Sequence, residues 1–172
     1  GCYSYVGRIG GEQEVSIGDG CGSIGTVAHE LSHTFGIFHV QSRYDRNDYV
    51  MVNERNIEND ALNNFDMESQ QSTDNYGLPY EFGSNMHYGE GDFGIDSSLP
   101  ALVARRGQEQ YQHSMKGRLP TFYDIMLVNK YYNCYDNCSN KISCANGGVQ
   151  DVNKCAQCKC PSGWSGPTCE QR

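Results

Sequence analysis

The chain has 172 residues, a formal charge of −8 and nine cysteines. Its length suits one medium domain followed by a small module, and nine cysteines are typical of an extracellular rather than a cytosolic protein. The negative charge argues against a nucleic-acid partner, and no apolar run is long enough to span a bilayer.

The first predicted element lies in residues 1–21. Cys2 and Cys21 bracket a glycine-rich, hairpin-like stretch, and the remaining cysteines cluster far along the chain. We therefore expect a disulfide between these two residues. The segment CYSYVGRI alternates small or polar residues with larger ones, which is typical of an exposed strand.

Apolar residues recur at helical spacing in the segment that follows. At about 100° per residue, one stripe of the predicted helix contains Ile24, Val27, Ala28, Leu31 and Phe35. We expect this stripe to be the core face, with His29 and His33 on roughly the opposite side. Gly22 or Ser23 is a plausible N-cap. Gly36 should end the helix, because glycine tolerates the left-handed conformation that reverses a chain.

The string HELSHTFGIFH, residues 29–39, has the spacing of a catalytic zinc site. His29 and His33 lie one helical turn apart and can chelate one ion. A reversal at the glycine can bring His39 back as a third ligand, and Glu30 can hold a water. Three protein ligands leave one coordination position open, which distinguishes catalytic zinc from structural zinc. A helix with surface histidines is the alternative, but the glycine and the third histidine in register argue against it.

Further motifs follow in a specific order. Residues 40–50 read VQSRYDRNDYV, NNFDMES comes next, and residues 84–88 read SNMHY. With the zinc motif and the N-terminal GCYSYVGRIGGEQEVSIGDGC, these segments resemble the astacin family of zinc endopeptidases, within the metzincins. The resemblance covers most of residues 1–134.

The resemblance implies a role for each matching residue. One Zn²⁺ per chain would be held by His29, His33 and His39. Glu30 would be the general base. Met86 would form the Met-turn, a tight loop that places a thioether beneath the histidines. Tyr88 would be an additional zinc ligand, which swings away to hydrogen-bond the oxyanion of the transition state.

The resemblance also implies where a substrate binds. In the family, the strand that matches the first segment of this chain forms the upper rim of the cleft and pairs with an extended peptide. Here its backbone hydrogen bonds would come from Cys2, Tyr3 and Ser4, as in other cases of strand addition.

The chain departs from the family at several points. Val40 stands where the family has a glutamate that anchors the N-terminus freed by prodomain removal, and Asn47 replaces an aspartate. Relative to the family's domain the chain begins part-way in, so we expect most of the upper subdomain and any prodomain to be missing from it. His87 and His113 match no ligand position, and we place them at the surface or behind the ligands.

The last part of the chain is rich in cysteine. Cys134 closes the segment TFYDIMLVNKYYNC, which suggests a final amphipathic helix through its residues Phe122, Ile125, Met126 and Val128. Six more cysteines follow, and the tail ends CKCPSGWSGPTC. It resembles an EGF-like module, in which disulfides replace a core too small to stabilise the fold. A zinc knuckle is the alternative for the CxxCxC run.

Nine cysteines cannot all pair within the chain. We expect the six tail cysteines to pair among themselves, in one of about fifteen connectivities. Cys134 should be left over, because the resemblance places its partner in the upper subdomain.

We therefore predict an α+β fold, with a partial metzincin catalytic domain at residues 1–134 and an EGF-like module at residues 135–172. The predicted function is a secreted zinc endopeptidase that cleaves protein or peptide substrates with Glu30 as general base. The alternative is a catalytically silent secreted protein that keeps the zinc fold and binds an extracellular protein through its EGF-like tail. Val40 and the missing upper subdomain favour that alternative, whereas Glu30 favours the enzyme.

Overall fold

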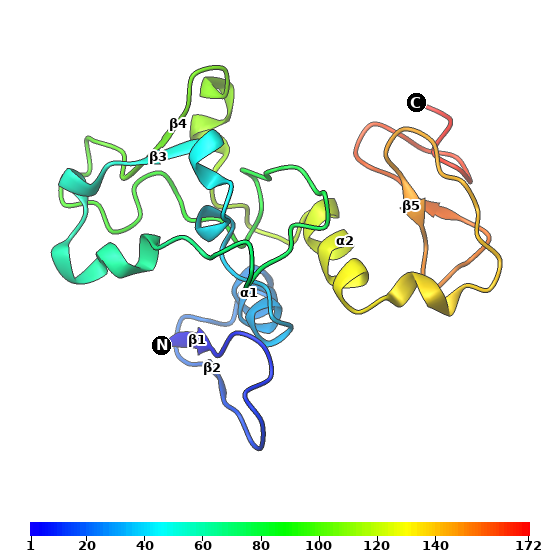
Figure 1. Cartoon of the computed structure of the whole chain (residues 1–172), viewed down its shortest axis with the longest axis horizontal. Coiled ribbons are helices and arrows are strands. Elements are labelled where there is room, and N and C mark those ends of the chain that lie inside the picture. Colours follow the sequence, from blue (N-terminus) through cyan, green and yellow to red (C-terminus); the bar gives the residue numbers. More distant parts are fainter. The chain divides into compact units, whose positions relative to one another are not determined.

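The computed structural model describes residues 1–172, whose contacts group them into two units, Gly1–Asp124 and Ile125–Arg172 (Figure 1). The division falls inside the last helix, earlier in the chain than the predicted boundary after residue 134. No helix is both long and apolar enough to cross a membrane. The helices and strands are α1 (Ile24–Thr34), α2 (Phe122–Tyr131), β1 (Cys2–Ser4), β2 (Val15–Ile17), β3 (Val50–Val52), β4 (Leu102–Ala104), β5 (Val149–Gln150) and β6 (Cys158–Lys159).

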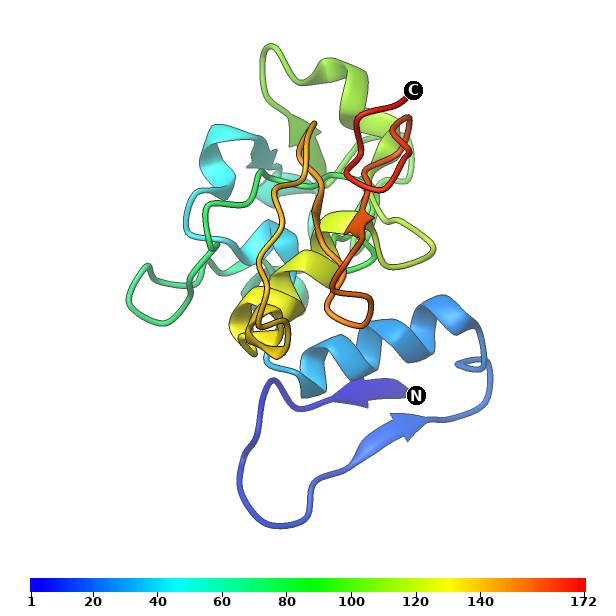
Figure 2. The ribbon, with the colours of Figure 1, turned by 90° about the vertical axis from the view of Figure 1, so that its right-hand side faces the viewer.

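The N-terminal segment is a two-stranded antiparallel hairpin that lies along helix α1 (Figure 2). Cys2 lies opposite Ile17 in the register and is disulfide-bonded to Cys21, as predicted. The first strand is shorter than the CYSYVGRI pattern suggested. Gly7 adopts φ +73° and donates its N–H to His33 O at 2.8 Å, which turns the chain away from the sheet towards the end of the helix.

Helix α1 begins and ends as its sequence predicts. Ser23 is the N-cap, and its hydroxyl accepts a hydrogen bond from the N–H of Thr26. Beyond the last helical residue Gly36 adopts φ +90°, and its N–H donates to His33 O. This reversal directs the following residues back along the helix.

The predicted core face of α1 is wrong. Ile24 is 77% exposed, and Leu31 and Phe35 are also exposed. The buried residues of the helix are Glu30 and His33. The side of the helix that carries the histidines therefore faces the rest of its unit. Residues 85–88 pack against this side rather than against the apolar stripe.

The core of the first unit is built from the irregular segment that separates the two helices in sequence. Strands β3 and β4 pair antiparallel, with Met51 opposite Val103. Short 3-10 turns connect much of the remainder: Val40–Ser42, Arg46–Asp48, Glu54–Asn56, Asn59–Phe65 and Glu109–Ser114. The buried cluster consists of Val50, Ile57, Ala61, Phe65, Tyr80, Phe82, Ala101, Leu102, Ala104 and Met115. Val40, the departure from the family pattern, packs against this cluster.

The second unit contains most of α2 and the cysteine-rich tail. A further 3-10 turn covers Cys134–Asn137, and the pairing of β5 with β6 is antiparallel. The tail disulfides are Cys138–Cys155, Cys144–Cys158 and Cys160–Cys169. Cys134 is free. The structure thus confirms that the tail cysteines pair among themselves and that Cys134 is left over.

Peptide mapping of the purified protein without reduction is expected to recover these four disulfides. A thiol-alkylating reagent should modify Cys134 and no other cysteine under native conditions, because the other eight sulfurs are bonded. After reduction all nine cysteines should react, which provides the control. A peptide that links Cys134 to Cys2 or Cys21 would contradict the pairing.

Candidate metal centre

His29 and His33 project from successive turns of α1, and each ring is fixed by a backbone carbonyl. The Nδ1–H of His29 donates to Asn85 O at 2.6 Å, and the Nδ1–H of His33 donates to Ile37 O at 2.8 Å. A carbonyl can only accept, so the hydrogen of each neutral ring is on Nδ1. The lone pair of Nε2 therefore remains available for a metal.

The third histidine joins them after the reversal at Gly36. His39 Nε2 lies 3.1 Å from His33 Nε2 and 3.2 Å from His29 Nε2. Zinc bound by nitrogen at about 2.0–2.1 Å with tetrahedral angles would separate its ligands by about 3.3 Å. The three rings therefore converge at the spacing that a Zn²⁺ ion requires, and they form a group able to hold a metal.

Burial keeps two of the rings uncharged. Desolvation lowers the pKa of His33 to about 4, although its hydrogen bond to Ile37 opposes this. Desolvation also lowers the pKa of His39 to about 3, with a further decrease from the neighbouring histidines. Both imidazoles are thus neutral at physiological pH, which is the form that binds metal.

Glu30 lies between the first two ligands in sequence and is buried. Its position on α1 is as predicted. The residues that line the pocket beside the metal centre do not include Glu30. Its part in proton transfer therefore stays a prediction.

The segment 84–88 forms a tight turn against the histidines. Met86 is fully buried, its N–H donates to Ser84 Oγ at 2.9 Å, and its carbonyl accepts from Val40 N at 2.9 Å. This last bond joins the turn to the residue after the third ligand. The role of Met86 as the Met-turn, with its thioether beneath the histidines, stays a prediction.

Tyr88 follows the turn and packs against the third ligand. The centroids of its ring and of the His39 ring are 4.6 Å apart. Burial raises the pKa of the Tyr88 phenol, with a smaller contribution from the charge of Asp92. The hydroxyl is therefore protonated at neutral pH and can donate a hydrogen bond.

Comparison with known proteins agrees with this geometry. Residues 1–133 match the family model described as Astacin, a peptidase family. The chain belongs to the astacin family. Two similar relatives from Caenorhabditis elegans are zinc metalloproteinase nas-31, 44% identical over 100% of this chain, and zinc metalloproteinase nas-29, 42% identical over 99%. The chain spans only 28% and 32% of the lengths of these two relatives.

The fold of this astacin-family chain also resembles a solved structure. The hatching enzyme zinc-protease high choriolytic enzyme 1 of Oryzias latipes aligns with a TM-score of 0.71 and 36% sequence identity, over 77% of this chain and 64% of that one. The predicted α+β catalytic fold is therefore confirmed as the astacin fold.

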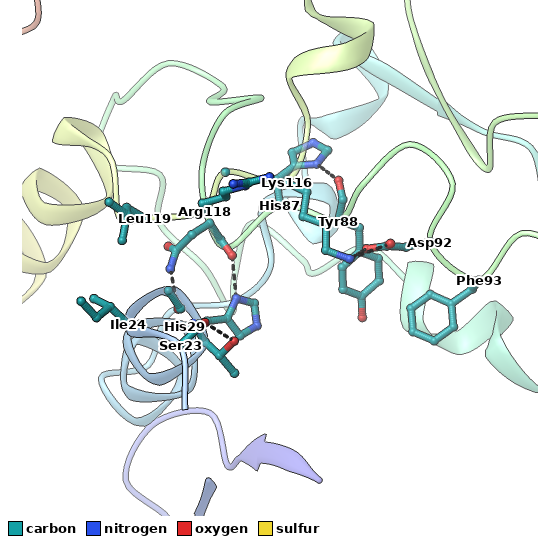
Figure 3. A pocket seen from close by; sticks show the side chains of 14 residues that line it. Ser23, Ile24, His29, His87, Tyr88, Asp92, Phe93, Lys116, Arg118 and Leu119 are labelled. Carbon is teal, nitrogen blue, oxygen red and sulfur yellow. Dashed lines mark hydrogen bonds and ion pairs between the residues drawn. The ribbon is translucent and has the colours of Figure 1, made fainter. Parts of the chain in front are cut away.

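A pocket of about 1000 Å³ opens beside the metal centre of this astacin-family chain (Figure 3). His29 lines one side of it, and Tyr88 and Phe93 line the other. Lys116 and Arg118 also contribute, and the Lys116 ammonium is paired with Asp92 at 2.8 Å. The sequence did not identify Asp92 and Phe93 as pocket residues, because they come from a segment with no recognisable motif.

Two histidines outside the ligand set have different environments. His113 is exposed, and its Nδ1 lies 2.9 Å from Glu90 Oε1. His87 is only 2% exposed and is hydrogen-bonded on both ring nitrogens. His113 therefore lies at the surface, and His87 is buried and bonded to Tyr80 and Tyr88.

The predicted substrate strand is β1. Tyr3 is half exposed, and the Ser4 hydroxyl lies 2.9 Å from the Thr34 hydroxyl at the end of α1. The sheet has two strands only, so β1 is an edge strand. Pairing of Cys2, Tyr3 and Ser4 with a substrate stays a prediction.

Proposed function

We propose that this chain forms the zinc-binding part of an endopeptidase that hydrolyses peptide bonds. The observation that carries this proposal is the convergence of three Nε2 atoms, each within 3.1–3.2 Å of a neighbour. The helix that provides two of these atoms also carries a buried glutamate, Glu30. Three imidazole nitrogens at this spacing suit a cation, and three protein ligands leave a position for a substrate or water.

The chemistry would be divided between the metal and the chain. When bound by His29, His33 and His39, zinc supplies Lewis-acid chemistry, which acidifies water and polarises the peptide carbonyl. Glu30 accepts a proton from the attacking water and later delivers it to the leaving amine. The Tyr88 hydroxyl donates a hydrogen bond to the oxygen on which negative charge develops.

The substrate would be an extended polypeptide. The outer edge of β1 offers backbone groups of Cys2, Tyr3 and Ser4 for pairing with it, so the protein would recognise main chain before side chains. A pocket that begins at His29 and Tyr88 would receive one substrate side chain beside the bond that is cleaved.

The tail would act separately from the catalysis. Residues 135–172, with their three disulfides and the β5–β6 pair, suit an EGF-like module that binds an extracellular protein. Four disulfides also suit a secreted protein, because such bonds persist in oxidising compartments.

The test is hydrolysis of a casein peptide by the zinc-loaded protein. We expect cleavage that stops when a chelator removes the metal and returns when zinc is added back. Zinc content is measured on the same samples. A protein that holds about one zinc per chain and cleaves nothing would refute the proposal and support the silent interaction protein.

Tyr88→Phe is expected to lower the hydrolysis rate by roughly 10²-fold, because it removes one donor to the oxyanion. The ring and its packing against His39 are kept, so zinc content should not change. Tyr111→Phe is the matched control, since it removes a phenol hydroxyl from an exposed ring outside the pocket. Equal rates for Tyr88→Phe and the parent would remove Tyr88 from the mechanism.

A further inference from the structure

The peptide groups on either side of Tyr88 are held by two buried side chains. Its N–H donates to Gln41 Oε1 at 3.0 Å, and its carbonyl accepts from His87 Nδ1 at 2.6 Å. Gln41 is 0% exposed and His87 is 2% exposed. Tyr88 is therefore fixed at its backbone while its ring lines the pocket.

A third buried residue determines which way His87 faces. Tyr80 OH lies 2.8 Å from His87 Nε2, and Tyr80 is 7% exposed. Because the carbonyl of Tyr88 can only accept, the ring hydrogen is on Nδ1 and Nε2 accepts from the phenol. The hydrogen bonds thus run in one direction, from Tyr80 through His87 to Tyr88.

Aromatic packing leaves the phenol of Tyr80 little freedom to turn away. Tyr49 stacks on Tyr80, with ring centroids 4.5 Å apart and planes 11° apart. Phe82 makes an edge contact with Tyr80 at 5.1 Å and stacks on His87 at 6.1 Å. The guanidinium of Arg43 lies 5.4 Å from the centroid of the Tyr80 ring.

Gln41, which holds the N–H of Tyr88, is also joined to the metal centre. Gln41 follows the ligand His39 by two residues, and its carbonyl accepts from Arg46 Nη1 at 2.9 Å. That same guanidinium nitrogen donates to Phe65 O. The segment that carries the third ligand is therefore connected through Gln41 to the backbone of Tyr88.

We propose that Gln41, His87 and Tyr80 are positioning residues that fix the backbone of Tyr88, so that its hydroxyl meets the reacting carbonyl. This inference rests on the proposed endopeptidase function. Gln41 and Tyr80 do not line the pocket, and His87 lines it with only 2% of its surface exposed, so each of the three acts through the backbone of Tyr88. The effect should therefore appear in turnover rather than in substrate binding, as it does when an interaction made only in the transition state is lost.

The test is a double-mutant cycle between Tyr80→Phe and Tyr88→Phe. Tyr80→Phe removes one hydroxyl and leaves His87 Nε2 without its donor. We expect kcat to fall roughly tenfold, with KM and zinc content unchanged. In the Tyr88→Phe background the same change should cost less than about twofold, because the group that it positions is already gone.

Two further variants distinguish a positioning role from a general effect on stability. Tyr49→Phe removes a hydroxyl from the ring that stacks on Tyr80 and should leave kcat unchanged. Gln41→Met removes the oxygen that accepts a hydrogen bond from the N–H of Tyr88. It should lower kcat as Tyr80→Phe does, and again only when Tyr88 is present. If Tyr80→Phe and Gln41→Met cost the same in both backgrounds, their role is general stability and the proposal is overturned.

A spectroscopic readout separates this inference from the proposed function. In the copper-loaded protein, the Tyr88 phenol should lose its proton when it coordinates the metal and give a phenolate-to-copper charge-transfer absorption, which Tyr88→Phe abolishes. We expect Tyr80→Phe to shift or weaken this band even if the protein cleaves no peptide. An unchanged band in Tyr80→Phe, or no band in the parent, would overturn the positioning role.

Discussion

Glu30→Gln is expected to lower the rate of peptide hydrolysis by about 10²–10⁴-fold, the usual effect of losing a general base. Glutamine keeps the shape of the side chain but cannot accept the proton of the attacking water. The three histidines are untouched, so zinc content should stay at about one per chain. Casein-peptide hydrolysis and metal analysis on the same preparation measure the two effects.

A matched control separates catalysis from a general loss of charge. Glu58→Gln makes the same chemical change at an exposed position that begins a 3-10 turn outside the pocket. It should leave both rate and zinc content unchanged. If Glu30→Gln cleaves as fast as the parent, Glu30 is not the base, and the mechanism is wrong.

His33→Ala is expected to remove most of the bound zinc and the activity with it. Loss of a group that only supports a ligand typically weakens metal binding by 10–100-fold, so loss of a ligand should cost more than about 100-fold. The remaining pair, His29 and His39, leaves the site two-coordinate with respect to the protein. Metal analysis after dialysis against a weak chelator measures the loss.

The control is a histidine outside the predicted metal site. His113→Ala removes an exposed imidazole that contacts Glu90, and it should retain zinc and activity at the level of the parent. Zinc content in His33→Ala equal to that in His113→Ala would defeat the ligand assignment.

The metal centre could be predicted because its determinants are local. His29, His33 and His39 lie within eleven residues of each other, and helical spacing with a glycine reversal is enough to bring them together. The Cys2–Cys21 bridge is similarly local, since a short hairpin joins its ends.

The environment of the centre could not be predicted in the same way. Periodicity identified the apolar stripe of α1, but it could not tell which face the rest of the chain would cover, and Ile24 is largely exposed. Gln41 and Tyr80 are polar residues whose burial depends on partners in other segments, since Gln41 is bonded to the N–H of Tyr88 and Tyr80 is stacked on Tyr49. No spacing rule joins Tyr80 to His87, so only the folded structure reveals their contact.

Val40 illustrates how a single departure is to be interpreted. In the sequence, Val40 replaces a charged glutamate that the family uses to anchor the N-terminus. In the folded chain its side chain packs against the buried cluster, and its N–H donates to Met86 O. The backbone bond that joins the third ligand to the turn does not depend on the side chain, so it is compatible with valine.

The two hydrogen bonds at the peptide groups of Tyr88 also limit how the Tyr88 hydroxyl can move, and therefore how long its movement takes. With its backbone held by Gln41 and His87, the hydroxyl can move only by rotation about the side-chain torsions. The rotation that displaces the hydroxyl is about χ1, which passes between staggered wells and needs no loop or domain movement, which takes about nanoseconds to milliseconds. Enzymes typically turn over about 1–10³ times per second. In the proposed endopeptidase, the hydroxyl would therefore reach its place many times within one catalytic cycle, and its movement would not set the rate.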